Sequence, residues 1–251
     1  MNDVKGTRIR QLRMAHGMTQ QDLSDATGGL VTKQSISKYE RGKSQPSPNV
    51  LRALAEAFGV KTADLFRPPE ARIEFVAYRK ASKLGLRKQE RVESIVHRAL
   101  EDRLRLQDLL GQVRDVDLPI RRWHVSTPHD AEQAAEALRA AWDLGHDPIA
   151  SVVDVLEDRH VHVIPIDAPD AFDGISALAY DEDAPIAAAV VCQNGRPGER
   201  QRLNLAHELA HLVLDVDPSE DFTEEKAAFR MGAAFLLPAN VVRRDVGRHR
   251  R

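Results

Sequence analysis

Two histidines spaced four residues apart carry the strongest chemical signal in the sequence. His207 and His211 frame the motif His-Glu-x-x-His within an aliphatic segment. On a helix, residues four apart lie on one face, one turn above the other, so both imidazoles can bind the same cation. Zinc suits the pair, because imidazole nitrogen at about 2.0–2.1 Å is one of its preferred ligands. Glu208 lies beside the first histidine, where its carboxylate can accept a proton from the water that the metal activates.

A catalytic zinc site needs a third protein ligand and leaves one position to water. Downstream of the motif, Thr223 can cap a helix that runs over residues 224–237 and ends at Pro238. Glu224 and Glu225 open this helix, and both have small or apolar residues three and seven positions on, so either can face a metal. An acid in the first turn also stabilises a helix simply by complementing its dipole. The residues alone therefore do not decide whether Glu224 or Glu225 is the third ligand.

Helices and strands are both expected around this motif in the C-terminal half. Thr127-Pro128 begins a helix that Gly145 ends, and a further helix is expected over residues 149–156. Apolar runs at residues 161–164 and 186–191 are typical of strands. The C-terminal half is therefore expected to be an α+β domain that positions the motif helix.

Other polar residues of this half are weaker candidates for chemistry. His160 and His162 alternate near the start of the first expected strand and could face a common site. Two structural histidines are the simpler interpretation. By chemistry alone, Tyr180 and this histidine pair are the candidates for stabilising an oxyanion.

The N-terminal segment predicts several short helices. Thr19 can cap one helix, Gly28-Gly29 interrupts the chain, and a second helix from Thr32 closes at Gly42, which is well placed as a C-cap. A helix that follows a capped helix after a turn is the arrangement of a helix-turn-helix, whose second helix enters the DNA major groove. The segment is therefore expected to form a small all-α bundle that binds double-stranded DNA.

Polar residues at and around the second helix are the candidate DNA contacts. Gln34 can pair with adenine, and Lys33 can reach guanine or phosphate from the exposed start of the helix. Residues that follow the helix would contact phosphate and fix the register. The predicted DNA-binding residues are Gln20, Lys33, Gln34, Ser37, Lys38, Arg41 and Lys43. A helical protein-interaction module with solvated charges is the alternative.

Charge is distributed unevenly along the chain. The formal net charge is only -2, yet residues 1–68 carry 11 Lys and Arg against 6 Asp and Glu, whereas residues 125–251 carry 12 against 23. The basic N-terminal segment can approach phosphate, and the acidic segment is repelled from it. The excess of five positive charges is modest for a DNA binder, so we expect a homodimer that adds the phosphate contacts of two copies.

The composition also indicates the compartment. The single cysteine, Cys192, excludes an intrachain disulfide framework and fits a reducing cytoplasm. No apolar run approaches the length of a membrane span, and the first residues lack the apolar core of a signal peptide. A cytoplasmic protein without a membrane partner is expected.

A long amphipathic helix is expected between the two halves. Pro68-Pro69 ends the N-terminal domain, and the apolar spacing predicts a helix over Leu86–Leu110. This helix could pair with its copy in a dimer or pack within the chain. The expected organisation is a DNA-binding domain over residues 1–68, a helical connector over 69–119 and a C-terminal domain over 120–251.

The first domain is similar to a known family. The segment from Leu12 through the run MTQQDLSDATGGLVTKQSISKYERGKSQPS, residues 18–47, resembles the Xre-type, phage-repressor-like helix-turn-helix family, and the resemblance covers about residues 6–68. One departure is a slightly longer turn, Gly28-Gly29-Leu30-Val31, before the second helix. The resemblance implies a transcription regulator whose partner is a double-stranded DNA operator.

The C-terminal domain resembles a second family. Asp173-Gly174-Ile175-Ser176, residues 186–191, residues 200–211 and the helix from Glu225 to Pro238 look together like the ImmA/IrrE family of zinc metallopeptidases. The resemblance implies a Zn²⁺ ion on His207, His211 and Glu225, with Glu208 as the general base. Members usually have Phe-Ala where this chain has Met231-Gly232, which is a departure in packing rather than in the ligands.

The two resemblances together imply a two-domain fold, in which a helical connector joins an all-α helix-turn-helix bundle to an α+β, gluzincin-like metallopeptidase domain. The implied function is a DNA-binding transcription regulator with a zinc-dependent endopeptidase domain that cleaves itself or a partner repressor. The alternative is a transcription regulator or antitoxin whose peptidase-fold domain binds a partner protein, such as a toxin, without hydrolysing it.

Overall fold

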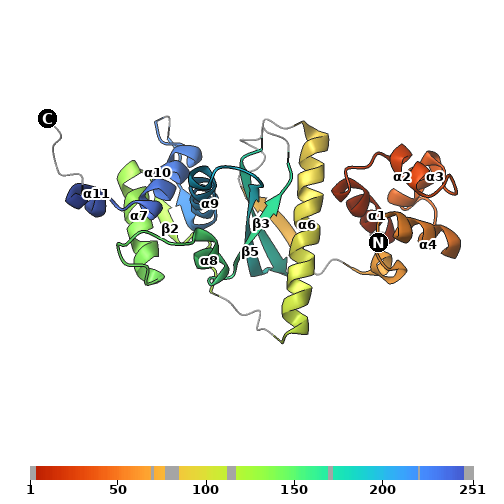
Figure 1. The fold of residues 1–251 in the computed structure, drawn as a ribbon, viewed down its shortest axis with the longest axis horizontal. Helices are drawn as coiled ribbons and strands as arrows, with labels where there is room; N and C mark the ends of the chain where they lie inside the picture. The colour runs from red at the N-terminus through yellow and green to blue at the C-terminus, as the bar shows by residue number, and fades with distance from the viewer. Residues whose placement is uncertain are drawn as a thin grey trace. The chain divides into compact units, whose positions relative to one another are not determined.

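The computed structural model describes residues 4–68, 71–76, 85–111, 117–168, 172–219 and 221–245 (Figure 1). Contacts between residues divide the chain into two compact units. Unit 1 takes residues 1–71 and 84–110, and unit 2 takes residues 72–83 and 111–251. The chain therefore leaves unit 1, returns to it and leaves it again. The expected boundary at Pro68-Pro69 falls at the edge of the described residues, and Pro69 lies outside them.

Unit 1 consists of short helices followed by one long helix. Its helices are α1 (Val4–Ala15), α2 (Gln20–Ala26), α3 (Lys33–Glu40), α4 (Pro48–Ala57), the 3-10 helix η1 (Thr62–Phe66) and α6 (Leu86–Leu109). The apolar faces of the short helices meet in one core, which buries Ile9, Leu23, Ile36, Leu54 and Phe58. Burial of such side chains contributes about 1.5–3 kcal/mol each and holds the short helices together.

Polar side chains and a glycine fix the ends of α2 and α3. Thr19 and Asp22 form a capping box, in which each side chain accepts a hydrogen bond from the backbone N–H of the other. Thr32 caps α3 by accepting from the N–H of Ser35 at 3.2 Å. Just beyond α3, Gly42 has a φ of 67°, a conformation that favours glycine. The predicted helix ends at these residues are confirmed.

Helix α6 packs on α1 within unit 1. Arg8 of α1 pairs with Glu101 of α6, and both side chains are largely buried. At the surface, Arg10 and Glu90 form a second pair of 2.8 Å. The buried apolar residues of α6 recur at helical spacing, as Val92, Val96, Leu100 and Leu104. The segment 69–119, expected as a helical connector, thus contributes α6 to unit 1 and a strand to unit 2.

Unit 2 contains a mixed sheet of four strands in the order β1-β4-β5-β3. The strands are β1 (Arg72–Val76), β4 (Gly174–Asp181), β5 (Ala184–Gln193) and β3 (Val161–Ile166). β4 runs antiparallel to both β1 and β5, whereas β3 runs parallel to β5. The expected strands at 161–164 and 186–191 are confirmed as parts of β3 and β5, while no strand was expected at 72–76, in the first part of the connector.

Unit 2 also contains helices and a second, two-stranded sheet. The helices are α7 (Pro128–Ala141), α8 (Val152–Glu157), α9 (Gly198–Val213), α10 (Glu224–Leu236) and α11 (Ala239–Asp245). Helices α8 and α9 pack on the four-stranded sheet, and α10 packs on α9 and α7. The second sheet pairs β2 (Trp123–Val125) in parallel with β6 (Leu214–Val216), which directly follows α9. A single apolar core includes residues of α7, α9, α10 and the central strands. Among the described helices, none combines the length and apolar character of a membrane span.

A glycine brings α10 close to α9. A Cβ atom placed on Gly232 of α10 would lie 3.0 Å from the carbonyl carbon of Ala206 and 3.0 Å from the backbone N of His207. These contacts are with backbone, which cannot swing aside as a side chain can. Glycine therefore allows the two helices that carry the candidate metal ligands to approach each other.

Candidate metal centre and nucleic-acid interface

Helix α9 presents its two motif histidines on one face. Its other faces bury Leu205, Ala206 and Leu209 in the core, so the helix is held firmly against the sheet. The Nε2 atoms of His207 and His211 lie 3.1 Å apart. Their rings pack edge to face with centroids 4.7 Å apart. The spacing of four residues therefore aims both imidazole Nε2 atoms at one point.

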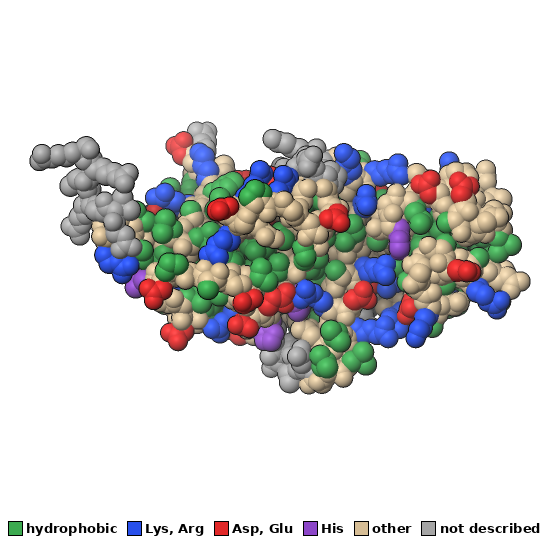
Figure 2. All heavy atoms as spheres, viewed as in Figure 1, with side chains coloured by type: hydrophobic (Ala, Val, Ile, Leu, Met, Phe, Trp, Pro, Cys, Tyr) green, Lys and Arg blue, Asp and Glu red, His purple; other side chains and the backbone are tan. Residues whose placement is uncertain are grey.

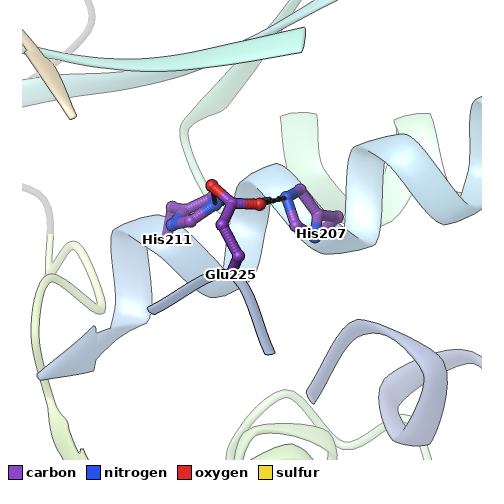
Figure 3. Close-up of side chains that lie close together, drawn as sticks. All are labelled: His207, His211 and Glu225. Carbon is purple, nitrogen blue, oxygen red and sulfur yellow. Dashed lines mark hydrogen bonds and ion pairs between the residues drawn. The ribbon is translucent and has the colours of Figure 1, made fainter. Parts of the chain in front are cut away.

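Helix α10 brings a carboxylate to the same point. Thr223 caps the helix through the N–H of Lys226, and Glu225 in the first turn reaches both histidines (Figure 3). Its Oε2 lies 3.4 Å from the Nε2 of His207, and its Oε1 lies 3.6 Å from the Nε2 of His211. Glu225, rather than Glu224, joins the two histidines in a group whose ligand atoms all lie within 4.8 Å of one another.

The spacing of these atoms fits a tetrahedral zinc ion. Donors that bind zinc at about 2.0–2.1 Å in a tetrahedron are separated from each other by about 3.3 Å. The two Nε2 atoms are 3.1 Å apart. Each of them lies near a different oxygen of Glu225, at 3.4 Å for His207 and 3.6 Å for His211, so each of these neighbouring pairs is close to this value. The histidine side chains are 12% and 7% exposed and the carboxylate 46%, so one side of the group is open. Two imidazoles and a carboxylate with one open position form the donor set of a catalytic zinc site.

Electrostatics favour the protonation states that bind a metal. Burial, reinforced by the charge of His207, lowers the pKa of His211 to about 4. A hydrogen bond with His207 lowers the pKa of Glu225. At neutral pH the group therefore presents a neutral His211 and a carboxylate, which are the forms that coordinate a cation. Among the described residues, the buried Nδ1 of His207 has no hydrogen-bond partner.

Glu208 lies beside this group and is not part of it. Its side chain is buried against β4, where Ser176 Oγ donates to Glu208 Oε2 at 2.8 Å. A Cβ on Gly174 would come within 2.6 Å of Glu208 Oε1, so only glycine leaves room for the carboxylate. Burial raises the pKa of Glu208 to about 7, although the charge of His207 and the bond from Ser176 oppose the increase. Glu208 can therefore gain or lose a proton near neutral pH.

Sequence reasoning missed the roles of Ser176 and Gly174. Both occur in the quoted motif Asp173-Gly174-Ile175-Ser176, but no role was assigned to them. Residues two apart on a strand face the same side. That alternation, applied to β4, would have directed both residues toward α9.

The other histidines and the tyrosine that the sequence offered lie elsewhere. Tyr180 is four residues beyond Ser176 on β4, which is about 13 Å along a strand, and its ring lies 4.6 Å from the guanidinium of Arg72. His160 is exposed in the turn before β3, while His162 is buried and lies 3.4 Å from Glu157. The two histidines therefore do not share a site.

The predicted DNA contacts gather around α3. Lys33 and Gln34 are exposed in its first turn, and Lys38 is exposed near its end. Arg41 and Lys43 are exposed just after the helix, and Figure 2 shows Lys and Arg side chains at the surface of this unit. Exposed positive charges at these positions can contact phosphate and fix the register of the domain on DNA.

Three of the predicted contacts, Gln20, Ser37 and Arg41, form hydrogen bonds within unit 1. Ser37 is half-buried and accepts a hydrogen bond from Arg41. Gln20 donates its side-chain amide to Glu40 at 2.8 Å. Glu40 also accepts from the buried Arg13 at 2.6 Å, which ties α1, α2 and α3 together. Gln20 is therefore part of the network that fixes α2 relative to α3.

Comparisons with known proteins also distinguish an N-terminal and a C-terminal domain. Residues 9–65 match the helix-turn-helix family, and residues 174–251 match the IrrE N-terminal-like domain of the M78 peptidases. A helix-turn-helix transcriptional regulator of Archaeoglobus fulgidus is 38% identical over 60 residues, which are 24% of this chain and 83% of the relative. One from Methanocaldococcus jannaschii is 37% identical over 59 residues, 24% of this chain and 86% of the relative.

A longer relative matches only in part. A helix-turn-helix regulatory protein of Pyrococcus furiosus is 29% identical over 96 residues, which are 33% of this chain and 30% of that protein. The chain thus spans less than a third of the length of this relative. No solved structure matches the chain.

The fold and the comparisons define a regulator with a helix-turn-helix DNA-binding domain and a peptidase-like domain. The chain belongs to the family of Xre-type helix-turn-helix transcriptional regulators, and its second domain is of the M78, IrrE N-terminal-like type.

Proposed function

We propose that this protein is a DNA-binding transcription regulator whose zinc-dependent endopeptidase domain cleaves the regulator itself or a partner repressor. The observation that carries the proposal is the convergence of His207, His211 and Glu225, whose ligand atoms lie within 4.8 Å of one another and form the donor set of a catalytic zinc site. We assign DNA recognition to residues 1–68, the connector to residues 69–119, and the gluzincin-like peptidase domain to residues 120–251. The regulator acts in the cytoplasm, with its operator.

The residues of unit 2 have separate roles in this proposal. His207, His211 and Glu225 bind the zinc ion through two Nε2 atoms and a carboxylate. When bound, zinc supplies Lewis acidity, which polarises a peptide carbonyl and makes water more acidic. Ser176 holds Oε2 of Glu208, which leaves Oε1 to accept a proton and pass it to the leaving amine. The core side of α9 excludes bulk water from Glu208.

The residues of unit 1 provide the DNA contacts. Gln34 and Lys33 read base edges from the first turn of α3, together with Ser37. Phosphate contacts come from Lys38, Arg41 and Lys43, while Gln20 positions α2 through Glu40. Two copies bind one operator as a homodimer, because a two-fold dimer doubles the number of phosphate contacts.

The test uses the purified full-length chain, incubated alone and with the Xre-type repressors encoded near it, in the presence of zinc or of a chelator. We expect fragments of the chain or of a repressor that form with zinc and not with the chelator. Bound zinc without any fragments, together with a stable complex with a partner, would instead support the regulator or antitoxin that binds without hydrolysis. Absence of bound zinc would contradict both.

A further inference from the structure

An exposed aromatic ring adjoins the candidate metal centre. Phe229 lies on α10 one turn after Glu225, so the two side chains share a face of the helix. Its ring centroid lies 4.3 Å from that of His207, with the planes tilted by 47°. Yet 54% of Phe229 remains exposed to solvent. One side of the ring therefore packs on a metal-binding residue, and another side is open.

Single apolar side chains are common on protein surfaces, so it is the position of this ring, and not its exposure alone, that distinguishes it. Among the described residues of unit 2, the exposed large apolar side chains are Val153, Phe229 and Leu237, and Phe229 is the one in contact with the metal-binding group. The neighbouring cations on α10 do not cover it. Lys226 donates to the carbonyl of Asp221 at 2.8 Å, and Arg230 pairs with Glu132.

The position of the ring suits contact with a polypeptide substrate. A peptide whose carbonyl oxygen reaches the open position beside His207 and Glu225 carries its neighbouring side chain only a few ångströms away. Aromatic rings attract each other at centroid distances of about 4.5–7 Å, and apolar side chains gain by covering exposed ring surface. The ring of Phe229 lies 4.3 Å from that of His207, so a side chain of a peptide held at the metal-binding group can reach its open side.

We propose that Phe229 is a specificity-determining residue that selects polypeptide segments with a large apolar or aromatic side chain next to the bond presented to the metal. The inference rests on the proposed function, since it assumes that the group binds zinc. It adds the substrate class, which the metal ligands alone do not define. Polar or glycine-rich segments would leave the ring exposed and would bind less tightly.

Binding of two hydroxamic acids to the zinc-loaded, full-length protein tests the proposal without requiring cleavage. Acetohydroxamic acid reports only on the metal, and 3-phenylpropanehydroxamic acid adds an aromatic group. Calorimetry should show that the wild type binds the aromatic probe about tenfold more tightly. Phe229→Ala should reduce this preference about threefold to tenfold, the contribution of an aromatic contact, and leave the affinity for acetohydroxamic acid unchanged.

Phe66→Ala is the matched control, because Phe66 is 45% exposed and belongs to unit 1. This variant should keep the wild-type preference. A preference that survives in Phe229→Ala would overturn the proposal. Equal weakening of both probes, with lower zinc content, would overturn it as well and assign Phe229 to positioning His207. If neither probe binds the wild type, the zinc site itself fails, and the proposed function fails with it.

Discussion

The candidate functional residues of this protein lie together at the metal centre and apart from one another on the DNA-binding surface. At the metal centre, three donors from two helices converge within 4.8 Å of one another, and the two imidazoles are almost buried. Around α3, the charged candidates Lys33, Lys38, Arg41 and Lys43 are separately exposed. A converging group acts as a unit, whereas separate surface charges contribute almost independently. Single substitutions should therefore have very different effects in the two regions.

The two regions also differ in the packing that supports them. The metal centre depends on close contacts, at Gly174 beside the carboxylate of Glu208 and at Gly232 beside the backbone of His207. Behind the DNA-binding surface, Glu40 accepts hydrogen bonds from Arg13 and Gln20. This network holds the helices together without involving the exposed side chains of Lys33 and Gln34. The following predictions test this contrast, starting with the largest effect.

Glu208→Gln should abolish cleavage and leave zinc bound. The change keeps the size of the side chain and removes its ability to take a proton, which contributes about 10²- to 10⁴-fold to the rate. Zinc content by mass spectrometry and the rate of fragment formation, compared with the wild type, would check it. Ser176→Ala, which removes only the hydrogen bond to Glu208, should have a smaller effect. Unchanged cleavage in Glu208→Gln would remove the residue from the mechanism.

Gly232→Ala should weaken zinc binding by less than about tenfold, at the low end of the range for changes next to metal ligands, since the family that this domain resembles usually has alanine here. The new Cβ would meet the backbone at Ala206 and His207, so α10 must shift slightly and carry Glu225 with it. The overpacking costs about 1–3 kcal/mol, partly offset by the helix preference of alanine, about 1 kcal/mol. Competition with a chromogenic chelator measures the affinity. Gly198→Ala on α9, where a Cβ meets nothing within 4 Å, should bind zinc as the wild type does.

Gln34→Ala and Lys43→Ala should separate base reading from phosphate contact. Loss of a base contact should weaken operator binding about tenfold and leave binding to unrelated DNA unchanged. Loss of Lys43 should weaken binding to both DNAs alike and reduce the slope of log K against log salt by about 1. Fluorescence anisotropy at several salt concentrations measures both effects. Equal behaviour of the two variants would contradict the assigned roles.

Mild acid should destabilise unit 1 through His97 of α6. Burial, with the charge of Arg8, lowers the pKa of His97 to about 4 from 6.5. The unfolded chain therefore binds a proton before the folded chain does, and stability falls as the pH decreases below about 6.5. Between pH 7 and pH 5.5 the loss should be about 1 kcal/mol. Urea unfolding at both pH values should show a smaller loss of stability in His97→Gln than in the wild type. His129→Gln, a change at an exposed histidine, should lose as much stability as the wild type does.

Local signals predicted the parts of the fold that depend on neighbouring residues. The capping box of Thr19 with Asp22 and the cap at Thr32 are fixed within four residues, so the sequence shows them directly. The spacing of His207 and His211 on one helix is equally local. These features could be predicted because a helix brings together residues that are close in the chain.

Contacts between distant segments could not be predicted in the same way. The strand Arg72–Val76 pairs with β4, whose residues are about a hundred positions away, and no strand was expected there. Its alternation of charged and apolar residues was a signal for a strand. The bond from Ser176 to Glu208 also joins separate elements. The choice of Glu225 over Glu224 came from family resemblance, because both residues fit the periodicity.

Metal content of the purified full-length protein tests the central claim most directly. Inductively coupled plasma mass spectrometry should find one zinc ion per chain in the wild type and less than about a tenth of that in His207→Ala. Lys33→Ala, which changes only the DNA-binding surface, should keep the full content. A wild type that binds no zinc when zinc is supplied, or a His207→Ala variant that keeps its zinc, would contradict the account.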